Sequence, residues 1–373
     1  MDIFIYGTLQ SSALRRAVAG SAPLDPIPAE LDCYAVLPLA GDVVPLIRVA
    51  AGAVTQGAVL SGITDAQLAR LDAYEGAFGY RLIDVSVRTQ AGTHAVKMYL
   101  PPDDIAVGQG DWSLAAWTAT HETPAVLAAT ELFAHQPPLS HRQIRARWHM
   151  FEKRAWAKYR AQNQALPATM RHNAQSDDVT IVSQQPPQGY FFGMQAVHIQ
   201  HRQFDGTQSA VLPREVFVGM DASLVLPYDP ARDRVLLVEQ VRMGAVIRQD
   251  PQPWMLEPIA GMVDARETPR EAALRESIEE AGITQMDLRH ISSFYPSPGS
   301  STDYFHAYLG LCDLPDAHAS FGGLETEAED IRLHLVDFAQ ALALVRTGEI
   351  NAGPLVMMLY WLAAERDTLR ATL

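Results

Sequence analysis

Three glutamates stand close together in the C-terminal half of the chain, at Glu276, Glu279 and Glu280. On a helix they fall within little more than one turn, where carboxylates repel one another. A solvated acidic face is the ordinary interpretation of such a cluster. A divalent cation would remove the repulsion, because Mg²⁺ prefers hard oxygen ligands and binds a few carboxylates together with phosphate oxygens. The spacing alone leaves both interpretations open.

The residues around this cluster predict the helix that must position it. Thr268 is a natural N-cap, and Glu271 completes a capping box with it. Pro269 suits the first helical position, and Gly282 can end the helix in a left-handed conformation. An apolar stripe on this helix would be buried, with the glutamates on the opposite side. The residues that share the spacing of such a stripe are Leu274, Ile278 and Ala281.

The complete segment of residues 261–283, GMVDARETPREAALRESIEEAGI, resembles the Nudix box of nucleoside-diphosphate-linked-X hydrolases. The resemblance implies a metal-dependent hydrolysis in which the glutamates hold the cation. Ser277 departs from the family pattern, which usually has an aliphatic residue at this position. We expect Arg275 to pair with Glu267 and to hold the loop on the helix. The matched fixed positions are Gly261, Glu267, Arg275, Glu276, Glu279, Glu280 and Gly282.

Four segments that flank the box resemble the ADP-ribose pyrophosphatase subgroup of this family: VLLVEQVRMGA, PWMLEPIAGM, FYPSPGSSTD and ETEAEDIRLHLV. The likeness runs from about residue 178 to the C-terminus. It implies hydrolysis of ADP-ribose, or of a related nucleoside diphosphate sugar, to AMP and ribose 5-phosphate. Mg²⁺ would neutralise the diphosphate and activate the attacking water, and Mn²⁺ could replace it. The subgroup also implies a homodimer formed through this half of the chain.

The same resemblance implies roles for individual carboxylates. Glu276 and Glu280 would be the main ligands and therefore catalytic, with Glu279 assisting. Glu327 would orient or deprotonate the attacking water. Two loop carboxylates so close together can exchange roles, so whether Glu327 or Glu329 is the base stays open. The implied metal ligands are the backbone carbonyl of Ala260 and the side chains of Glu276, Glu279, Glu280 and Glu329.

Further residues match substrate contacts of the subgroup. Arg242 would bind phosphate or adenine, and Ser297 and Asp303 would face the terminal ribose. The subgroup usually has glutamate in place of Asp303. Gly219 falls where an arginine is expected, which removes one phosphate contact. Met262 is a further expected substrate contact. In the subgroup, some residues of one protomer contribute to the active site of its partner. The matching residues here are Phe191, Phe192, Arg214 and Glu215, and the two phenylalanines would stack on adenine.

The N-terminus carries a second pattern that could do chemistry. Tyr6-Gly7-Thr8-Leu9 ends a predicted strand, so its backbone N–H groups are free to bind an oxyanion. Glu75, in the segment LDAYEG, follows a predicted helix and could serve as a base. Together these residues resemble the gamma-glutamylcyclotransferase-like (AIG2-like) family. The resemblance implies that Glu75 takes a proton from the substrate's α-amine, which attacks its own γ-carbonyl and releases 5-oxoproline. The alternative is a surviving fold without activity, in which Glu75 is a surface acid.

Composition limits the classes of partner. The chain has 373 residues and a formal net charge of −14, which argues against a general nucleic-acid binder. No segment reaches the roughly 20 apolar residues that span a bilayer, so we expect no membrane partner. Cys33 and Cys312 show no metal-ligand spacing and are expected to be reduced core thiols of a cytoplasmic protein.

These observations predict an α+β protein of two domains. Residues 1–101 would form the gamma-glutamylcyclotransferase-like, β-barrel-like domain, and residues 178–373 a Nudix α/β/α sandwich. Residues 102–177 would be a connector and linker with helices at about 124–135 and 140–164. The second helix has a basic face, which we expect to be solvated or to pack against acidic neighbours; binding of an acidic partner or phosphate is the alternative. Fusions of these two folds resemble proteins grouped with tellurite resistance. A sensor that binds ADP-ribose, or a scaffold, without turnover is the alternative function.

Overall fold

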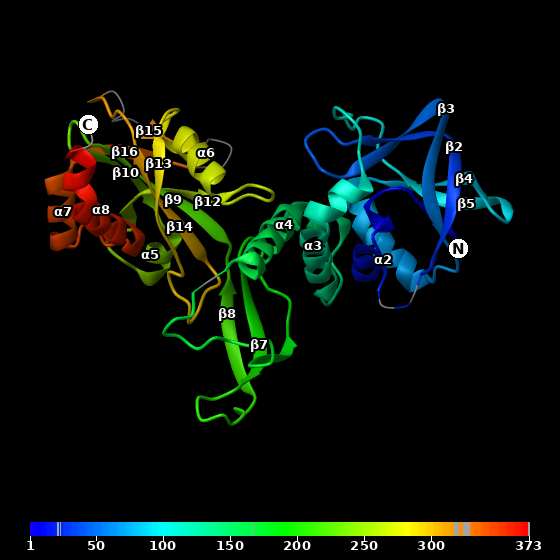
Figure 1. Ribbon diagram of the computed structural model, residues 1–373, viewed down its shortest axis with the longest axis horizontal. Coiled ribbons are helices and arrows are strands. Elements are labelled where there is room, and N and C mark those ends of the chain that lie inside the picture. Colours follow the sequence, from blue (N-terminus) through cyan, green and yellow to red (C-terminus); the bar gives the residue numbers. More distant parts are fainter. Residues whose placement is uncertain (21, 23, 166, 317–320, 324–328, 372–373) are drawn as a thin grey trace. The chain divides into compact units, whose positions relative to one another are not determined.

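The computed structural model describes residues 1–371 apart from residues 21, 23, 166, 317–320 and 324–328 (Figure 1). The chain divides into two compact units. The first contains Met1–Phe191 and Ala196–Pro213, and the second contains Phe192–Gln195 and Arg214–Leu373.

A closed barrel forms the core of the first unit. Its five strands run in the order β1-β3-β2-β4-β5, and a parallel pairing of β1 with β5 closes it. Phe4, Ile47 and Met98 are among the buried side chains that fill its interior. The predicted barrel-like domain is therefore confirmed. The strands are β1 (Ile3–Ile5), β2 (Pro26–Pro38), β3 (Pro45–Leu60), β4 (Arg81–Thr89) and β5 (Gly92–Leu100).

Helices pack on this barrel, and two of them belong to the predicted connector. Trp148 makes edge-to-face contacts with Tyr74 and Phe78, at ring-centroid distances of 5.7 and 5.4 Å. These contacts join the helix that contains Trp148 to the helix that contains Tyr74 and to the turn that contains Phe78. The helical elements are η1 (Thr8–Gln10), α1 (Ser12–Ala19), α2 (Asp65–Glu75), η2 (Gly76–Phe78), α3 (Leu114–Ala134) and α4 (His141–Asn163).

The start predicted for α3 near residue 124 is wrong. The helix begins at Leu114, where the Ser113 side chain accepts a hydrogen bond from the Ala116 backbone N–H. Pro124 lies inside the helix, although proline removes a backbone hydrogen bond there. Trp117 in the early part of α3 is buried in the same core as the barrel strands. Burial of this part of the helix outweighs the penalty of the internal proline.

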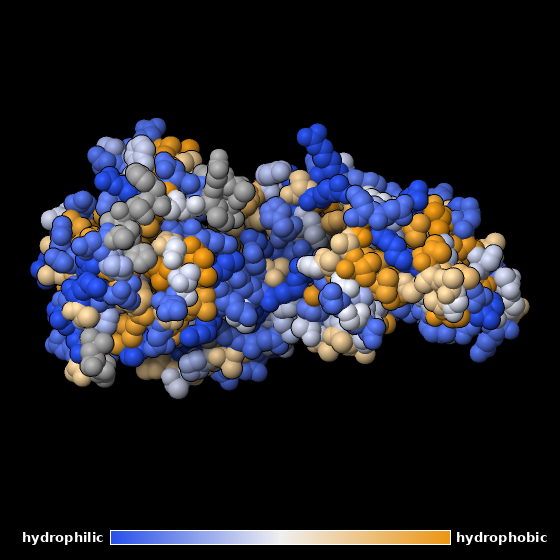
Figure 2. Space-filling model, turned by 90° about the horizontal axis from the view of Figure 1, so that it is seen from above, coloured by the Kyte–Doolittle hydropathy of each residue, from blue (hydrophilic) through white to orange (hydrophobic). Residues whose placement is uncertain are grey.

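A three-stranded sheet follows, in the order β6-β7-β8. Every residue of β6 is exposed, including Val179, Ile181 and Val182. Figure 2 shows hydrophobic patches interspersed among hydrophilic residues on the face that it presents. The strands are β6 (Val179–Gln184), β7 (Gly193–His201) and β8 (Leu212–Val218).

The second unit is an α/β/α sandwich, as predicted. Its central sheet runs β13-β14-β9-β10-β16-β15, with β11 paired to β10 and β12 paired to β9. Helix α6 covers one face, and α7 and α8 cover the other (Figure 1). The strands are β9 (Asp221–Asp229), β10 (Arg234–Val241), β11 (Trp254–Glu257), β12 (Ile259–Met262), β13 (Asp287–Phe294), β14 (Tyr304–Leu311), β15 (Phe321–Gly322) and β16 (Ile331–Asp337). The helices are α5 (Met243–Arg248), α6 (Pro269–Ala281), α7 (Phe338–Thr347) and α8 (Gly353–Ala371).

Successive side chains of β9 alternate between the two helical layers that cover the sheet. Leu224 and Leu226 join the core beneath α7 and α8, whereas Val225 joins the core beneath α6. Successive side chains of a strand point to opposite faces, so a nearly continuous apolar run is needed where both faces are covered.

The apolar face predicted for α6 is largely wrong. Leu274 and Ile278 are 37% and 49% exposed, and only Ala281 of the predicted stripe is buried. The helix instead turns its small residues towards β9 and β12, together with one glutamate. Small side chains allow the close approach that brings this glutamate to the sheet. The buried residues of α6 are Ala272, Ala273, Ser277, Glu280 and Ala281.

The expectation of two core thiols is also wrong in part. Cys33 is exposed, with a positive φ of 63°, where the pairing of β2 with β3 shifts register. Cys312 is partly buried at the end of β14. None of the helices that the structure describes is long and apolar enough to cross a membrane.

Candidate active sites

The helix α6 has the termini that its sequence predicts. The Thr268 side chain accepts from the Glu271 N–H, and the Glu271 carboxylate accepts from the Thr268 N–H at 2.8 Å. Pro269 begins the helix, and Gly282 ends it with φ 65° in the left-handed region. Ser277, the departure from the family pattern, is fully buried and donates to the Ala273 carbonyl at 2.7 Å. The helix therefore satisfies this hydroxyl within its own backbone.

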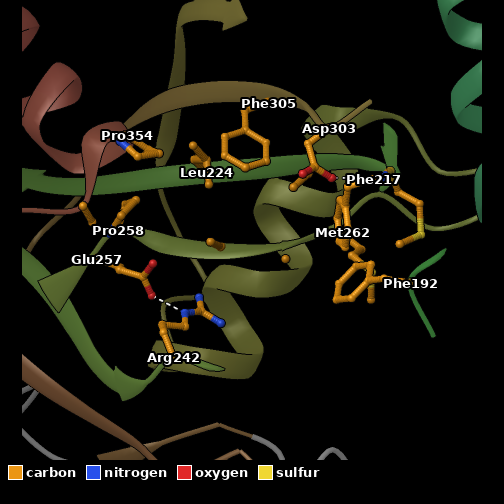
Figure 3. A pocket seen from close by; sticks show the side chains of 15 residues that line it. Phe192, Phe217, Leu224, Arg242, Glu257, Pro258, Met262, Asp303, Phe305 and Pro354 are labelled. Atoms are coloured by element: carbon orange, nitrogen blue, oxygen red, sulfur yellow. Dashed lines mark hydrogen bonds and ion pairs between the residues drawn. The ribbon is translucent and has the colours of Figure 1, made fainter. Parts of the chain in front are cut away.

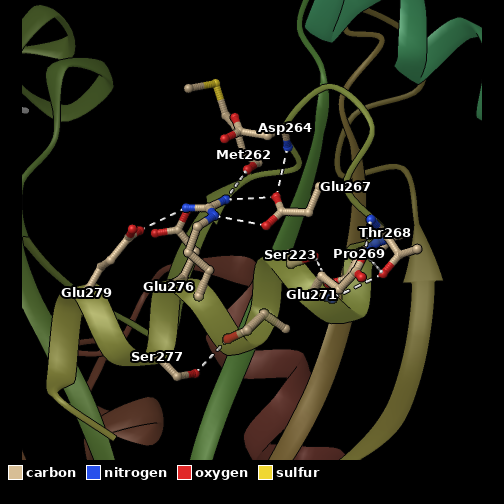
Figure 4. Close-up of polar contacts among 12 residues, drawn as sticks. Ser223, Met262, Asp264, Glu267, Thr268, Pro269, Glu271, Glu276, Ser277 and Glu279 are labelled. Carbon is tan, nitrogen blue, oxygen red and sulfur yellow. Dashed lines mark hydrogen bonds and ion pairs between the residues drawn. The ribbon is translucent and has the colours of Figure 1, made fainter. Parts of the chain in front are cut away.

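Arg275 holds the loop before α6 against the helix through contacts with Glu267 and Met262, which are labelled in Figure 4. Its Nε and Nη2 lie 2.9 Å from the two carboxylate oxygens of Glu267, and Nη2 also donates to the Met262 carbonyl at 3.0 Å. Glu267 in turn accepts from the Asp264 N–H at 3.0 Å. The expected pairing of Arg275 with Glu267 is present.

The same guanidinium contacts two of the clustered glutamates. Nη1 of Arg275 lies 2.6 Å from Glu276 Oε1 and 2.9 Å from Glu279 Oε2. The hydrogen bonds to Glu267, and then the charge of Glu276, raise the pKa of Arg275. A positive charge thus balances the outer side of the cluster.

Glu280 is the buried member of the cluster. It is 1% exposed, and its Oε2 accepts from the Ala260 N–H at 3.3 Å. Its Oε1 is buried and has no hydrogen-bond partner among the described residues. Burial, followed by the charges of Glu276 and Glu329, raises the pKa of Glu280 to about 9. Glu280 therefore has the properties of a ligand that needs a cation.

A divalent cation fits these residues. An unpaired buried carboxylate oxygen is destabilising, and a cation that binds it would satisfy it and lower the mutual repulsion. Glu280 and Glu276 would hold such a cation, with Glu329 within electrostatic reach. Within the described parts of the chain, no group of three or more His, Cys, Asp or Glu side chains is arranged so that it could hold a metal ion by itself. Glu327, the expected base, lies outside the described residues.

Gly261 shows how closely the strand and the helix approach at this point. A Cβ at this position would lie 1.8 Å from Glu276 Oε1. No side chain larger than hydrogen fits here while Glu276 keeps its place. A larger residue at this position would therefore displace the Glu276 side chain.

A pocket of about 370 Å³ adjoins this cluster, because Ala260 and Gly261 line both (Figure 3). Its size suits a small ligand. Arg242 forms an ion pair with Glu257 on its wall, and the rings of Phe192 and Phe217 lie 5.0 Å apart. The expected site residues that line it are Phe192, Arg242, Ala260, Met262 and Asp303.

The two departures from the subgroup pattern lie side by side, and one of them, Asp303, lines this pocket. A Cβ at Gly219 would lie 1.6 Å from Asp303 Oδ1, so the aspartate occupies the space next to the glycine. Asp303 Oδ1 also accepts from the Met220 N–H at 3.3 Å, and its Oδ2 accepts from the Ser301 hydroxyl at 2.6 Å. The absence of a side chain at Gly219 therefore leaves the space that the Asp303 carboxylate occupies. The two residues are far apart in the sequence, so this contact could not be predicted from it.

Other expected contacts are not among the residues that line this pocket. Phe191 packs on His149 and its carbonyl accepts from Arg154, both in α4. Ser297 is exposed and bonds to Ser300 at 2.8 Å. Arg214 and Glu215 lie in β8. Two lining residues that sequence reasoning missed are Phe217 and Glu257, although an acidic residue ending an apolar strand was a usable signal for Glu257.

The predicted oxyanion-binding loop, Tyr6-Gly7-Thr8-Leu9, follows β1 and continues without a break into η1. The Tyr6 hydroxyl donates to the Tyr99 carbonyl at 3.1 Å, and the Leu9 carbonyl accepts from Arg15 at 3.0 Å. The N–H groups of Thr8 and Leu9 lie in the first turn of η1, where a helix offers no internal acceptor. A Cβ at Gly7 would lie 3.0 Å from Pro45, so a larger residue would crowd the loop.

Glu75 lies near this loop at the C-terminal end of α2. It is partly buried, and burial raises its pKa to about 7. Burial, and then the charge of Glu75, raises the pKa of Tyr6, Tyr74 and Tyr80. The Tyr99 hydroxyl is buried without a partner among the described residues. The loop and the glutamate therefore share one tyrosine-rich environment, which argues against a plain surface acid.

Comparison with known proteins finds a matching family model for a separate part of each half of the chain. Residues 220–356 match the family model described as NUDIX domain. Residues 3–114 match the model described as gamma-glutamyl cyclotransferase, AIG2-like.

Three relatives cover the C-terminal half. An ADP-ribose pyrophosphatase from Haemophilus influenzae is 40% identical over 195 residues, which is 52% of this chain and 89% of the relative. An ADP-ribose pyrophosphatase from Escherichia coli (strain K12) is 36% identical over 55% of this chain and 95% of the relative. A GDP-mannose pyrophosphatase from Enterobacter sp. (strain 638) is 30% identical over 40% of this chain and 76% of the relative.

Proposed function

We propose that this chain, which belongs to the Nudix hydrolase family and carries an N-terminal AIG2-like gamma-glutamyl cyclotransferase domain, hydrolyses the diphosphate of ADP-ribose to AMP and ribose 5-phosphate. The observation that carries this proposal is the buried Glu280, which has one unpaired oxygen and accepts a hydrogen bond from Ala260 in the wall of a pocket that Arg242 also lines. The names of the relatives support a nucleoside diphosphate sugar as the class of substrate.

A divalent metal is implied by the family, and Mg²⁺ is our choice because its ligands here are all oxygens. When bound, it would supply positive charge that neutralises the diphosphate and activates water. Glu276 and Glu280 would hold it, with the Ala260 carbonyl, Glu279 and Glu329 as further ligands. Arg275 would keep the outer glutamates in place, since it already binds Glu276 and Glu279.

The pocket residues would bind and orient the nucleotide. Phe192 and Phe217 offer aromatic surface to a base, and Arg242 offers a positive charge to a phosphate. Asp303 would accept hydrogen bonds from hydroxyls of the terminal ribose. For the base that accepts the water's proton we propose Glu327, with Glu329 as the alternative.

We also propose that the protein is a homodimer formed through its C-terminal half. The support is the exposed sheet β6-β7-β8, which carries Val179, Ile181, Val182 and Met194 at its surface. Exposed apolar strands of this kind are usually covered by another chain.

A hydrolysis screen tests the main proposal. The full chain would be incubated with Mg²⁺ and ADP-ribose, GDP-mannose, NADH or a diadenosine phosphate, and the products would be resolved by chromatography. We expect AMP and ribose 5-phosphate from ADP-ribose, and no turnover in the presence of EDTA. Tight binding of ADP-ribose without turnover would favour the sensor instead.

A second activity is supported by the surroundings of Glu75. A carboxylate with a pKa near 7 is suited to accept a proton at neutral pH, and the N–H groups of Thr8 and Leu9 could bind the developing oxyanion. We propose that the first unit releases 5-oxoproline from a γ-glutamyl amine. The test is a panel of γ-glutamyl amines and peptides with the full chain, in which formation of 5-oxoproline is measured.

A further inference from the structure

Arg48 of β3 is a cation of the first unit that neither proposed reaction uses. Its Nη2 donates to two carbonyls of the segment that follows β5, that of Pro102 at 2.8 Å and that of Ile105 at 3.0 Å. Its Nη1 donates to the Ile47 carbonyl on its own strand at 3.2 Å. A guanidinium presents its donors in a rigid planar fork, so these bonds fix where the segment lies relative to β3.

This segment, residues 101–108, borders on the turn that carries the proposed base. The Pro102 ring lies against Gly79, because a Cβ at Gly79 would be 3.1 Å from Pro102 Cγ. Gly79 ends the short turn η2, which begins directly after Glu75. The position of residues 101–108 therefore limits where the turn after Glu75 can lie.

The same segment also contacts the loop between β2 and β3. The Gly108 N–H donates to the Pro38 carbonyl at 2.8 Å, at the start of this loop. At its other end, Pro45 lies against Gly7 of the oxyanion-binding loop, with its Cγ 3.0 Å from a Cβ placed at Gly7. Both parts of the proposed cyclotransferase site, the base and the N–H donors, thus border on structure that the arginine holds together.

Arg48 and Glu75 act on the same tyrosines. Burial raises the pKa of Tyr6 and Tyr80, the charge of Glu75 raises it further, and the charge of Arg48 opposes this rise. We propose that Arg48 is a positioning residue for release of 5-oxoproline, which binds two carbonyls of residues 101–108 and so keeps Glu75 in place. This inference rests on the proposed function of the first unit, to which all of these residues belong.

Loss of the planar fork should slow the chemical step and expose the base. A misplacement of about 1 Å can cost roughly 100-fold in rate, so we expect kcat to fall by about 10- to 100-fold. Burial raises the pKa of Glu75 to about 7 from an ordinary value of 4.5. A segment that is no longer held admits water to the carboxylate, so this pKa should fall towards its ordinary value. The acidic limb of the pH–rate profile should then move to lower pH.

The decisive variant is Arg48→Lys in the full chain. Lysine keeps the positive charge but lacks the planar fork. Because the charge is kept, a shift of the pH–rate profile reports the exposure of Glu75 rather than the loss of a charge. The other ionisable groups of this environment are unaltered in the variant, namely Tyr6, Asp42, Asp72, Tyr74, Tyr80, Tyr99 and Glu152.

Arg88→Lys is the matched control in the same barrel. Arg88 lies on β4, and its Nη2 binds the carboxylates of Glu30 and Asp32 at 3.0 and 2.8 Å on the exposed surface. We expect kcat and the pH–rate profile to stay unchanged in this variant.

Pro102→Ala provides a second variant that leaves Arg48 in place. It removes the ring that lies against Gly79 but keeps the carbonyl that the arginine binds. A smaller fall in kcat is expected, with a pH shift in the same direction. The effects of Arg48→Lys and Pro102→Ala should be non-additive, because both changes act through one contact with the turn after Glu75.

Three results would overturn the inference. The first is an equal kcat and pH–rate profile in Arg48→Lys and Arg88→Lys, and the second is additivity of Arg48→Lys with Pro102→Ala. The third is a rise in KM with kcat and the pH–rate profile unchanged, which would indicate that Arg48 binds the substrate's carboxylate directly.

If the unaltered chain releases no 5-oxoproline from any γ-glutamyl compound of the panel, the proposed cyclotransferase activity fails instead. Hydrogen–deuterium exchange of residues 76–80 then measures the same positioning without a substrate. Exchange should be faster in Arg48→Lys and unchanged in Arg88→Lys, because only the first change releases the turn after Glu75. Equal exchange in the two variants would overturn the role of Arg48 independently.

Discussion

Replacing Glu280 by glutamine should lower the rate of hydrolysis and, at the same time, raise the stability of the metal-free protein. Glutamine keeps the size and helix propensity of the residue but removes a charged metal ligand. We expect ADP-ribose hydrolysis to fall by at least about 100-fold, the scale of losing a group that stabilises charge in the reaction. Initial rates over a range of Mg²⁺ concentrations measure this effect. Near-normal turnover with an unchanged metal dependence would refute the assignment of Glu280.

The same change should stabilise the metal-free protein, and the sign follows from its pKa. Glu280 titrates near 9 in the folded chain against an ordinary value of 4.5, so between these values the folded state holds a proton that the unfolded state has released. Stability is therefore lost as pH rises through this window. The full shift corresponds to a ceiling of about 6 kcal/mol, and a gain of about 1–3 kcal/mol is a reasonable expectation after relaxation of the site.

Denaturant unfolding in EDTA at pH 6 and pH 8 tests this expectation. The gain of Glu280→Gln in free energy of unfolding should be larger at pH 8, because the unaltered protein loses more there. Glu271→Gln is a matched control on the same helix, since Glu271 is exposed and serves only the capping box. An equal or negative change at both pH values would contradict the proposed burial of an unpaired carboxylate.

Three further predictions follow from other parts of the structure. Gly261→Ala places a Cβ 1.8 Å from Glu276 Oε1 and should raise the Mg²⁺ concentration for half-maximal rate by at least about 10-fold; an unchanged metal titration would contradict this. Glu75→Gln should abolish release of 5-oxoproline and leave ADP-ribose hydrolysis intact, and the unaltered rate should fall as pH drops below about 7, where Glu75 becomes protonated. Ile181→Asp should shift the protein towards monomer in sedimentation velocity, because a charge is costly in an apolar interface; a dimer that withstands it would exclude β6 from the interface.

The ends of α6 could be read from the sequence, but its orientation could not. Helix caps depend on residues that are adjacent in sequence, so the capping roles of Thr268 and Gly282 could be predicted from the residues next to them. The buried face depends on what the helix packs against, and here the close approach of β12 favours Ser277 and Glu280 over Leu274. Apolar periodicity predicts the buried face of a helix correctly only when that face packs through large apolar side chains.

Pairs that are distant in sequence were beyond sequence reasoning for a different reason. The resemblance to the Nudix family gave a set of site residues, and several of these line one pocket. The contact of Gly219 with Asp303, however, depends on the loop before β14 meeting the end of β8, which no single pattern records. Arg154 is a further example: sequence reasoning placed it on a basic face that is solvated or packs against acidic neighbours, and only the fold identifies the neighbour as Glu131.

The burial of Glu280 shows why a site residue can contradict the rules that predict a fold. A carboxylate without a partner destabilises the protein that contains it, so stability alone would replace it with an apolar residue. The presence of Glu280 is explained if a bound cation supplies the missing partner of its carboxylate, because cation binding then offsets the destabilisation caused by burying the group. Such a residue is invisible to apolar periodicity and becomes recognisable through its unpaired oxygen and raised pKa, which are features of the folded chain.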